Sequence, residues 1–266
     1  MPTVKKELTN FRVMVKSRHP SHGILRKELP LFRFRSIVRL GSETDVQDTV
    51  TNGGKRVECN TIEGIRNTSD KVKMKEIFRD NKIKSPDFIV PKSDNEILKW
   101  SKDKYPIIIK IENHSRGRGM VKVDNEEDMK IWLTKNNEHN HIFERYLGFA
   151  REYRLHMSQN GCFYCFRKMR KQDAKERWFF NSSNCAWMLE TNPLFDKPKC
   201  WNEIIDECKN ALNALKLDIG GFDVRVSKDG KEFTIIEANS ACSFGDITAR
   251  KYIAEISRII QEKHVY

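Results

Sequence analysis

Asp223, Glu237 and Asn239 carry the kind of side-chain oxygen that a hard metal ion prefers. Mg²⁺ in particular keeps several waters and fills the rest of its shell with carboxylates and nucleotide phosphates. The three residues lie in two alternating apolar and polar runs, 220–227 and 232–239, on either side of an Asp-Gly turn signal. This pattern predicts a β-hairpin that holds Mg²⁺, and the alternative is a hairpin whose polar face simply meets water.

The loop of this hairpin decides whether the oxygens meet. Opposite residues on paired antiparallel strands share one face of the sheet. A two-residue loop at 229–230 would place Asp223 beside Ile236, whereas a three-residue loop would place Asp223 opposite Glu237. We predict the second register because it gathers the oxygen ligands at one point.

Two basic stretches could neutralise phosphates. Lys110 lies in the apolar run 106–112 and needs an anionic partner there, because an unpaired buried ammonium is costly. The run 113–120 follows, and its glycines let backbone N–H groups approach phosphate oxygens. Further on, a hairpin predicted over 152–170 forms a cationic floor with Arg154 on its polar face. On the neighbouring strand the floor continues with Arg167 or Lys168.

Several motifs occur in the order typical of one family. The run from Asp223 to Glu237-Ala238-Asn239-Ser240 resembles the closing signature of the ATP-grasp superfamily, in which such residues hold Mg²⁺ against ATP. Residues 67–86 resemble its entry segment, 106–123 its phosphate-covering lid, and 141–156 its hinge. The compact amino-acid ligases similar to the ribosomal-protein glutamate ligase have the nearest pattern.

The resemblance implies roles for individual residues. The metal ligands would be Asp223, Glu237 and Asn239, with Mg²⁺ or Mn²⁺ as the ion. The ATP-binding residues would be Lys71, Lys110, Arg116, Gly117, Gly119, Glu144, Arg145, Tyr146, Leu147, Glu152, Lys168 and Asn181. Among them, the backbone around residues 145–147 would read adenine and Glu152 would accept from the ribose hydroxyls.

The implied activity is an ATP-dependent carboxylate–amine ligase that forms an amide through an acyl phosphate. Catalytic cations would be Arg225, which shares a face with Asp223, together with Arg167 and Arg154. Substrate contacts would come from Arg39 and Ser42, at the end of a predicted strand, and from Ser240. The partners would be a small carboxylate such as an amino acid and an amine acceptor, such as an acidic peptide or protein.

The fold implied is α+β with an α/β N-terminal part. We expect a small basic domain over 1–67, an ATP-grasp N-subdomain over 68–142 and a C-subdomain over 143–266. Strands are predicted at 11–16 and 36–40, and helices beginning at 68–71, over 201–215 and over 247–263. The helix at 68–71 would have Ser or Thr as its N-cap.

Composition bounds the function further. The 266 residues carry a net charge of +12, which favours acidic peptides, polyphosphates or nucleic acids as binding partners of the protein. Seven scattered cysteines and the lack of a long apolar run favour a cytoplasmic protein with reduced thiols and no membrane contact. Two alternatives remain: the same fold acting on a nucleic-acid-linked acceptor, and a non-catalytic basic nucleic-acid-binding protein. The lack of any RNP, KH or helix-turn-helix pattern in the sequence argues against a nucleic-acid-binding protein.

Overall fold

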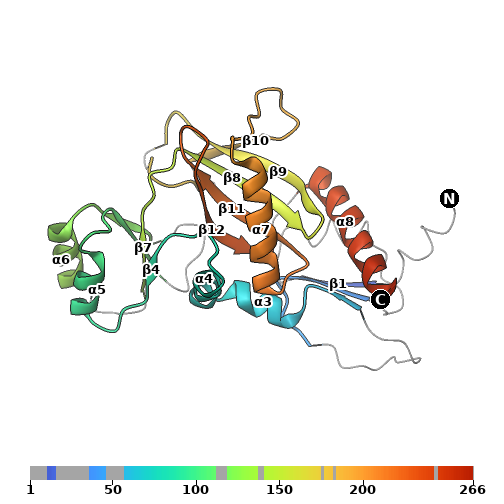
Figure 1. Cartoon of the computed structure of the whole chain (residues 1–266), viewed down its shortest axis with the longest axis horizontal. Coiled ribbons are helices and arrows are strands. Elements are labelled where there is room, and N and C mark those ends of the chain that lie inside the picture. The colour runs from blue at the N-terminus through green and yellow to red at the C-terminus, as the bar shows by residue number, and fades with distance from the viewer. Residues whose placement is uncertain are drawn as a thin grey trace.

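The computed structural model describes residues 11–15, 36–45, 57–111, 119–136, 141–174, 177–181, 184–242 and 245–265. These residues form three sheets, placed along the longest axis of the molecule (Figure 1). The predicted strands at the N-terminus are confirmed as β1 (Phe11–Val15) and β2 (Ser36–Leu40), which pair in parallel. The short strand β3 (Val57–Cys59) completes this first sheet.

The central sheet is antiparallel and has the order β10-β9-β8-β11-β12. Its strands are β8 (Arg151–Ser158), β9 (Gly161–Arg170), β10 (Cys185–Leu189), β11 (Ile219–Val226) and β12 (Phe233–Asn239). Alternate residues such as Tyr153, Leu155 and Val224 point to one face and pack in a core with the apolar stripe of helix α7 (Trp201–Leu215) (Figure 1). Asp223, Arg225, Glu152 and Arg154 alternate with these residues and point to the other face, so alternation along the strands positions the site.

A smaller sheet lies at the other end of the molecule, in the order β4-β7-β5-β6. It consists of β4 (Phe88–Ile89), β5 (Ile107–Ile111), β6 (Val121–Val123) and β7 (His141–Arg145). Helices α5 (Asp94–Ser101) and α6 (Glu126–Lys135) pack on it, and each begins with a side-chain cap from Ser93 or Asn125. The hairpin strands β5 and β6 therefore rest on a packed base of helices.

Helices α3 (Ile62–Ser69) and α4 (Lys71–Asp80) join the core of the central sheet. The N-cap of α4 is Asp70, whose side chain accepts from the Lys73 N–H; Ser or Thr was predicted. Met74 and Phe78 of α4 are buried in the same core as Leu212 of α7. The packing therefore does not follow the predicted boundary at 67/68, because α4 buries its apolar face against α7 and β12, not against the smaller sheet.

Helix α8 (Asp246–Val265) covers the first sheet and part of the central one. Its Tyr252 and Ile256 share a core with Val38 and Leu40 of β2. The N-terminal strands are thus held by the helix that comes last in the structure. In the described part of the chain, no helix combines the length and apolarity needed to cross a membrane.

Candidate functional site

A β-bulge brings the predicted metal ligands together. Asp223 of β11 lies opposite Glu237 of β12, as predicted, but the loop is not the reason. Near the turn, Val226 pairs with Phe233, which is the register of a two-residue loop. The register shifts between Asp223 and Val224, and Ile236 is the extra residue on β12. The bulge therefore supplies the one-residue shift that we had assigned to the loop.

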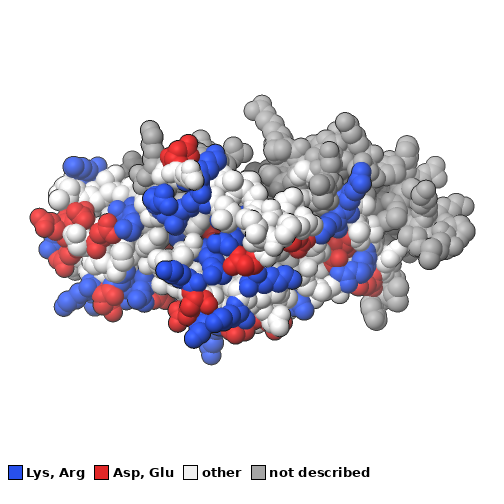
Figure 2. Space-filling model, turned by 90° about the horizontal axis from the view of Figure 1, so that it is seen from above, with Lys and Arg blue, Asp and Glu red and all other residues white. Residues whose placement is uncertain are grey.

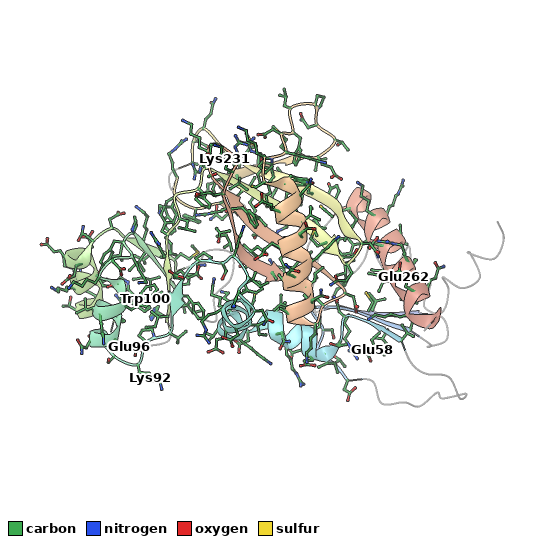
Figure 3. The ribbon with its side chains drawn as sticks, in the orientation of Figure 1. Glu58, Lys92, Glu96, Trp100, Lys231 and Glu262 are labelled. Atoms are coloured by element: carbon green, nitrogen blue, oxygen red, sulfur yellow. The ribbon has the colours of Figure 1, made fainter. Side chains whose placement is uncertain are left out.

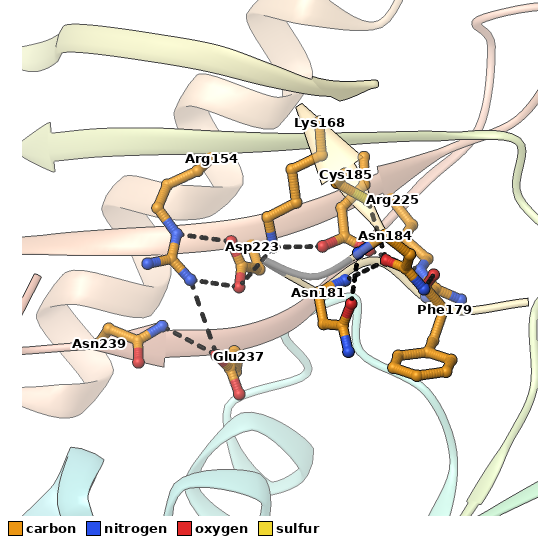
Figure 4. Close-up of polar contacts among 11 residues, drawn as sticks. Arg154, Lys168, Phe179, Asn181, Asn184, Cys185, Asp223, Arg225, Glu237 and Asn239 are labelled. Atoms are coloured by element: carbon orange, nitrogen blue, oxygen red, sulfur yellow. Dashed lines mark hydrogen bonds and ion pairs between the residues drawn. The ribbon is translucent and has the colours of Figure 1, made fainter. Parts of the chain in front are cut away.

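Asp223 is the centre of a buried charge cluster (Figure 4). Its Oδ1 accepts from Arg154 Nε at 2.7 Å and its Oδ2 from Arg154 Nη2 at 2.5 Å. Lys168 Nζ lies 3.2 Å from the same Oδ2. Burial alone would raise the pKa of Asp223, but the two cations hold that pKa well below its usual value. Asp223 is therefore ionised across the physiological range.

Arg154 lies between the two carboxylates that were predicted to bind metal. Its Nη2 is also 3.8 Å from Glu237 Oε1, and Asn239 Nδ2 donates to that same oxygen at 3.1 Å (Figure 4). This hydrogen bond uses only the side-chain NH₂ group of Asn239, so the side-chain carbonyl oxygen of Asn239 can serve as a further hard ligand. A guanidinium held between these carboxylates indicates that the donor set attracts a cation, so the residues fit Mg²⁺.

The fit depends on oxygen atoms from outside the chain. Among the described residues, no group of three or more His, Cys, Asp or Glu side chains could hold a metal. Two carboxylates and one amide leave most of the six positions of Mg²⁺ to water and phosphate oxygens. The site therefore suits a metal that arrives together with a nucleotide.

A second row of charges runs across the same face, because Arg225, Glu152 and Lys168 are consecutive partners on β11, β8 and β9. Glu152 is 4% exposed, and its two oxygens lie 2.5 Å from Lys168 Nζ and 2.9 Å from Arg225 Nε. Burial lowers the pKa of Lys168, but Asp223 and Glu152 raise it further than burial lowers it. Lys168 therefore links the two rows as a fully charged ammonium.

The smaller sheet contributes a third buried charge cluster. Glu144 of β7 is 3% exposed, and its Oε1 lies 2.7 Å from Lys110 Nζ of β5 and 3.0 Å from Lys75 Nζ of α4. The anionic partner predicted for Lys110 is therefore present. Burial raises the pKa of Glu144, but the two lysines more than compensate and lower it. Sequence reasoning missed Lys75, whose only signal is its place beside Met74 on the buried stripe of α4.

One pocket lies between the smaller sheet and the β11–β12 hairpin, and Lys110, Glu144 and Arg225 from these clusters line it. Residues 144–147, which we call the hinge, line one side of the pocket, and Arg225 and Ile236 line the side of the hairpin. Its lining consists of Pro86, Ile108, Lys110, Met120, Glu144, Arg145, Tyr146, Leu147, Trp178, Arg225 and Ile236. Arg225 lies 5.6 Å from the ring of Tyr146, whose hydroxyl donates to the carbonyl oxygen of Trp178 at 3.0 Å. The hinge and the hairpin, far apart in the sequence, thus face each other.

Some predicted site residues lie elsewhere. Arg167 pairs with Tyr153, so it points to the face opposite Asp223, where its guanidinium contacts Asp196. We therefore remove Arg167 from the cationic floor, and Lys168 takes that place. Asn181 exchanges hydrogen bonds with Asn184, accepting from its N–H at 3.0 Å, and it closes a local turn.

The predicted substrate residues are engaged in structural contacts. Arg39 is fully buried, with Glu58 at 3.4 Å and the carbonyl oxygen of Thr44 as partners. Figure 3 shows Glu58 on the α8 side of the molecule and Trp100 of α5 on the opposite side. The hydroxyl of Ser42 contacts Thr44, so burial and local pairing argue against substrate contact at either Arg39 or Ser42.

The remaining predicted residues are placed as follows. Ser240 accepts from the Thr68 hydroxyl at 2.9 Å and fastens the end of β12 to α3. Lys71 begins α4, half-buried, and does not line the pocket. Arg116 and Gly117 lie outside the described residues, whereas Gly119, with φ at 69°, leads into β6.

Comparison with solved structures identifies the architecture. The chain has the ATP-grasp fold, because structures of an ATP-grasp ligase match nearly its whole length. A structure of the ATP-grasp ligase PsnB with its precursor peptide PsnA2 and AMPPNP matches 97% of this chain and 99% of its own, with a TM-score of 0.65 and 12% identity. D-alanine–D-alanine ligase from Bacillus anthracis matches with a TM-score of 0.65 and 13% identity, covering 96% of both chains.

A third match extends the range of chemistry among these neighbours. N5-carboxyaminoimidazole synthase from Aspergillus clavatus, in complex with ADP and 5-aminoimidazole ribonucleotide, gives a TM-score of 0.60 at 12% identity. The alignment covers 88% of this chain and 70% of that one. No protein-family model matches the sequence, and neither does any curated protein. The likeness is therefore one of fold.

Proposed function

We propose that this protein is an ATP-dependent carboxylate–amine ligase. The observation that carries the proposal is the pocket in which hinge residues 144–147 face Arg225 and Ile236, next to the carboxylates Asp223 and Glu237. A nucleotide bound at the hinge would extend its phosphates along the charged face of the central sheet. The structural neighbours support this use of the fold, since those named above include a ligase complexed with AMPPNP and a synthase complexed with ADP.

The hinge offers one backbone donor to adenine. The N–H of Arg145 donates to the carbonyl of Asp87 at 2.9 Å, and that of Tyr146 donates to Pro106 at 2.8 Å. These bonds leave the Leu147 N–H as the hinge donor for a ring nitrogen. Ile236, turned into the pocket by the bulge, and Met120 supply apolar surface for the two faces of the base.

The charged rows would bind the phosphates. Lys110 lies at the pocket wall with 17% of its side chain exposed, in a position to meet a phosphate oxygen. Mg²⁺, when bound to Asp223, Glu237 and Asn239, would neutralise the charge on the phosphate oxygens. Arg225 lines the nucleotide pocket, so we assign it to the nucleotide and not to the acyl phosphate as the sequence suggested.

Arg154 is the cation that we assign to the transferred phosphoryl group. It lies beside both predicted metal-binding carboxylates, and a metal between them would compete for the same oxygens. Its guanidinium would then be released toward the phosphoryl group, whose three oxygens suit a planar fork of N–H donors. Asp223 and Glu237 would thus be neutralised by Arg154 when the metal is absent and by the metal when it is bound.

The reaction would take place in two steps. A carboxylate oxygen of the substrate attacks the γ-phosphorus of ATP, the bond between that phosphorus and the β–γ bridging oxygen breaks, and ADP leaves. An amine nitrogen then attacks the acyl carbon, phosphate departs with the C–O bond electrons, and the nitrogen loses a proton to leave an amide. Positioned cations stabilise the charge in both steps.

The substrates are a small carboxylate, such as an amino acid, and an amine acceptor, for which a peptide is our preferred class. Lys and Arg side chains spread over the face shown in Figure 2, interspersed with acidic ones. PsnB, which is complexed with a precursor peptide, shows that the fold accommodates a peptide partner. A nucleic-acid-linked acceptor gains no such support from the structural neighbours.

The test is release of ADP and phosphate with Mg²⁺ and a pool of the amino acids. The wild type should release ADP in a manner that depends on the pool, and Glu237→Gln should release almost none while keeping its fold. If Glu237→Gln turned over ATP like the wild type, the metal assignment would be refuted. Replacing Mg²⁺ by Mn²⁺ should preserve activity, because the donors are oxygen atoms that suit both ions.

A further inference from the structure

Lys75 is a buried lysine that joins the two halves of the nucleotide pocket. It is 2% exposed and belongs to α4, whose neighbours Met74 and Phe78 lie in the core of the central sheet. Its ammonium forms an ion pair at 3.0 Å with Glu144, which belongs to β7 of the smaller sheet. A buried ammonium needs such a partner, because desolvation penalises an unpaired charge. The ion pair of Lys75 and Glu144 therefore connects the core of the central sheet to the smaller sheet.

Glu144 is shared between two cations. The same oxygen, Oε1, lies 3.0 Å from Lys75 Nζ and 2.7 Å from Lys110 Nζ. One carboxylate and two ammonium groups leave a surplus of one positive charge. Lys110 lines the pocket, whereas Lys75 does not and lies behind Glu144. The positive charge that Glu144 does not neutralise is therefore located at Lys110 in the pocket, where solvent ions screen it weakly because the group is largely buried.

We propose that Lys75 is a positioning residue for ATP. It balances Glu144 from behind and holds it in place, so that the charge of Lys110 stays available for a nucleotide phosphate. Without Lys75, Glu144 would neutralise Lys110 and draw it away from the phosphate. This inference rests on the proposed nucleotide site, and Lys75 itself touches no nucleotide.

The experiment compares ADP with adenosine, which lacks phosphates. Affinity for ADP is measured by calorimetry and affinity for adenosine by ligand-observed NMR, in the wild type and in Lys75→Met. Lys73→Met is the matched control, because Lys73 lies exposed on the same helix. We expect Lys75→Met to weaken ADP about tenfold and to leave adenosine within about twofold, since the lost contribution concerns phosphate alone. Lys73→Met should change neither.

A second comparison tests whether Lys75 acts through Glu144. In a Glu144→Gln background, adding Lys75→Met should change ADP affinity by less than about twofold, because the carboxylate that Lys75 balances is gone. If Lys75→Met alone does not fold, this double variant decides, since it contains neither charge. A further tenfold loss of ADP affinity in the double variant would overturn the inference.

The outcomes separate this inference from the proposed function. If the wild type binds ADP and Lys75→Met binds it equally well, the role of Lys75 is refuted while the nucleotide site stands. Equal losses for ADP and adenosine would show a distorted pocket and would also refute the role. If the wild type binds neither ligand, the proposed function itself fails, and the inference with it.

Discussion

Asp223→Asn should both inactivate and destabilise the protein, and this combination distinguishes it from Glu237→Gln. Asp223 is 4% exposed and receives three contacts from Arg154 and Lys168, at 2.5 to 3.2 Å. Removing one member of a buried ion pair costs about 3–5 kcal/mol. Lys168 keeps Glu152 as a partner and the amide still accepts one bond, so we expect a loss of about 2–3 kcal/mol.

Glu237→Gln provides the matched comparison. The side chain of Glu237 is 37% exposed, and its ion pair with Arg154 is long, at 3.8 Å. Its loss should cost no more than about 0.5 kcal/mol, as for other surface pairs. Urea denaturation measures both stabilities, and ADP release measures both activities. Equal stability losses in the two variants would refute the assignment of Asp223 as the buried centre of the cluster.

Three further predictions follow from the same contacts. Because the pKa of Asp223 is lowered on folding, its contribution to stability is present above its unfolded pKa, about 3.9, and lost as pH falls below it. The difference in unfolding free energy between wild type and Asp223→Asn should therefore shrink from about pH 5 to pH 2, and a constant difference would contradict the linkage. Deleting Ile236 should leave Glu237 opposite Asp223 in an unbulged hairpin, so calorimetry should show weaker ADP binding with Mg²⁺-dependent turnover retained at high ATP; loss of turnover at saturating ATP would count against it. Arg154→Gln should abolish ADP release, whereas Arg167→Gln, on the opposite face, should keep it within about twofold; inactivity of a folded Arg167→Gln would return that residue to the site.

The sequence predicted the elements that have strong local signals. Alternation placed Asp223 and Arg225 on one face, and a lysine in an apolar run indicated an anionic partner for Lys110. A bulge has no such signal, since one extra residue in a strand of seven leaves the pattern readable in either register. The facing pair Asp223 and Glu237 was therefore predicted from its chemistry, while its cause was not.

Tertiary contacts decided the other differences. The lysines at positions 71, 73 and 75 are typical of a solvated helix, and only the approach of Glu144 from another sheet gives Lys75 a buried partner. Arg39 lies near the end of β2, where ligands often bind, yet its guanidinium is paired with Glu58 of β3. Such pairings depend on residues distant in sequence, which local patterns do not relate.

The packing of α8 on the first sheet has a consequence for synthesis of the protein. Val38, Leu40 and Cys59 share a core with Tyr252, Ile256 and Ile259, so the apolar face of the first sheet is covered only after residues 246–265 have been synthesised. Contacts between such distant segments slow folding and leave apolar surface exposed in the meantime. A chain truncated before residue 246 should accordingly bind a hydrophobic dye. If the truncated chain bound no dye, the apolar face of the first sheet would not depend on α8 for its cover. Until residues 246–265 have been synthesised, the apolar face of the first sheet is therefore a surface that a chaperone could bind.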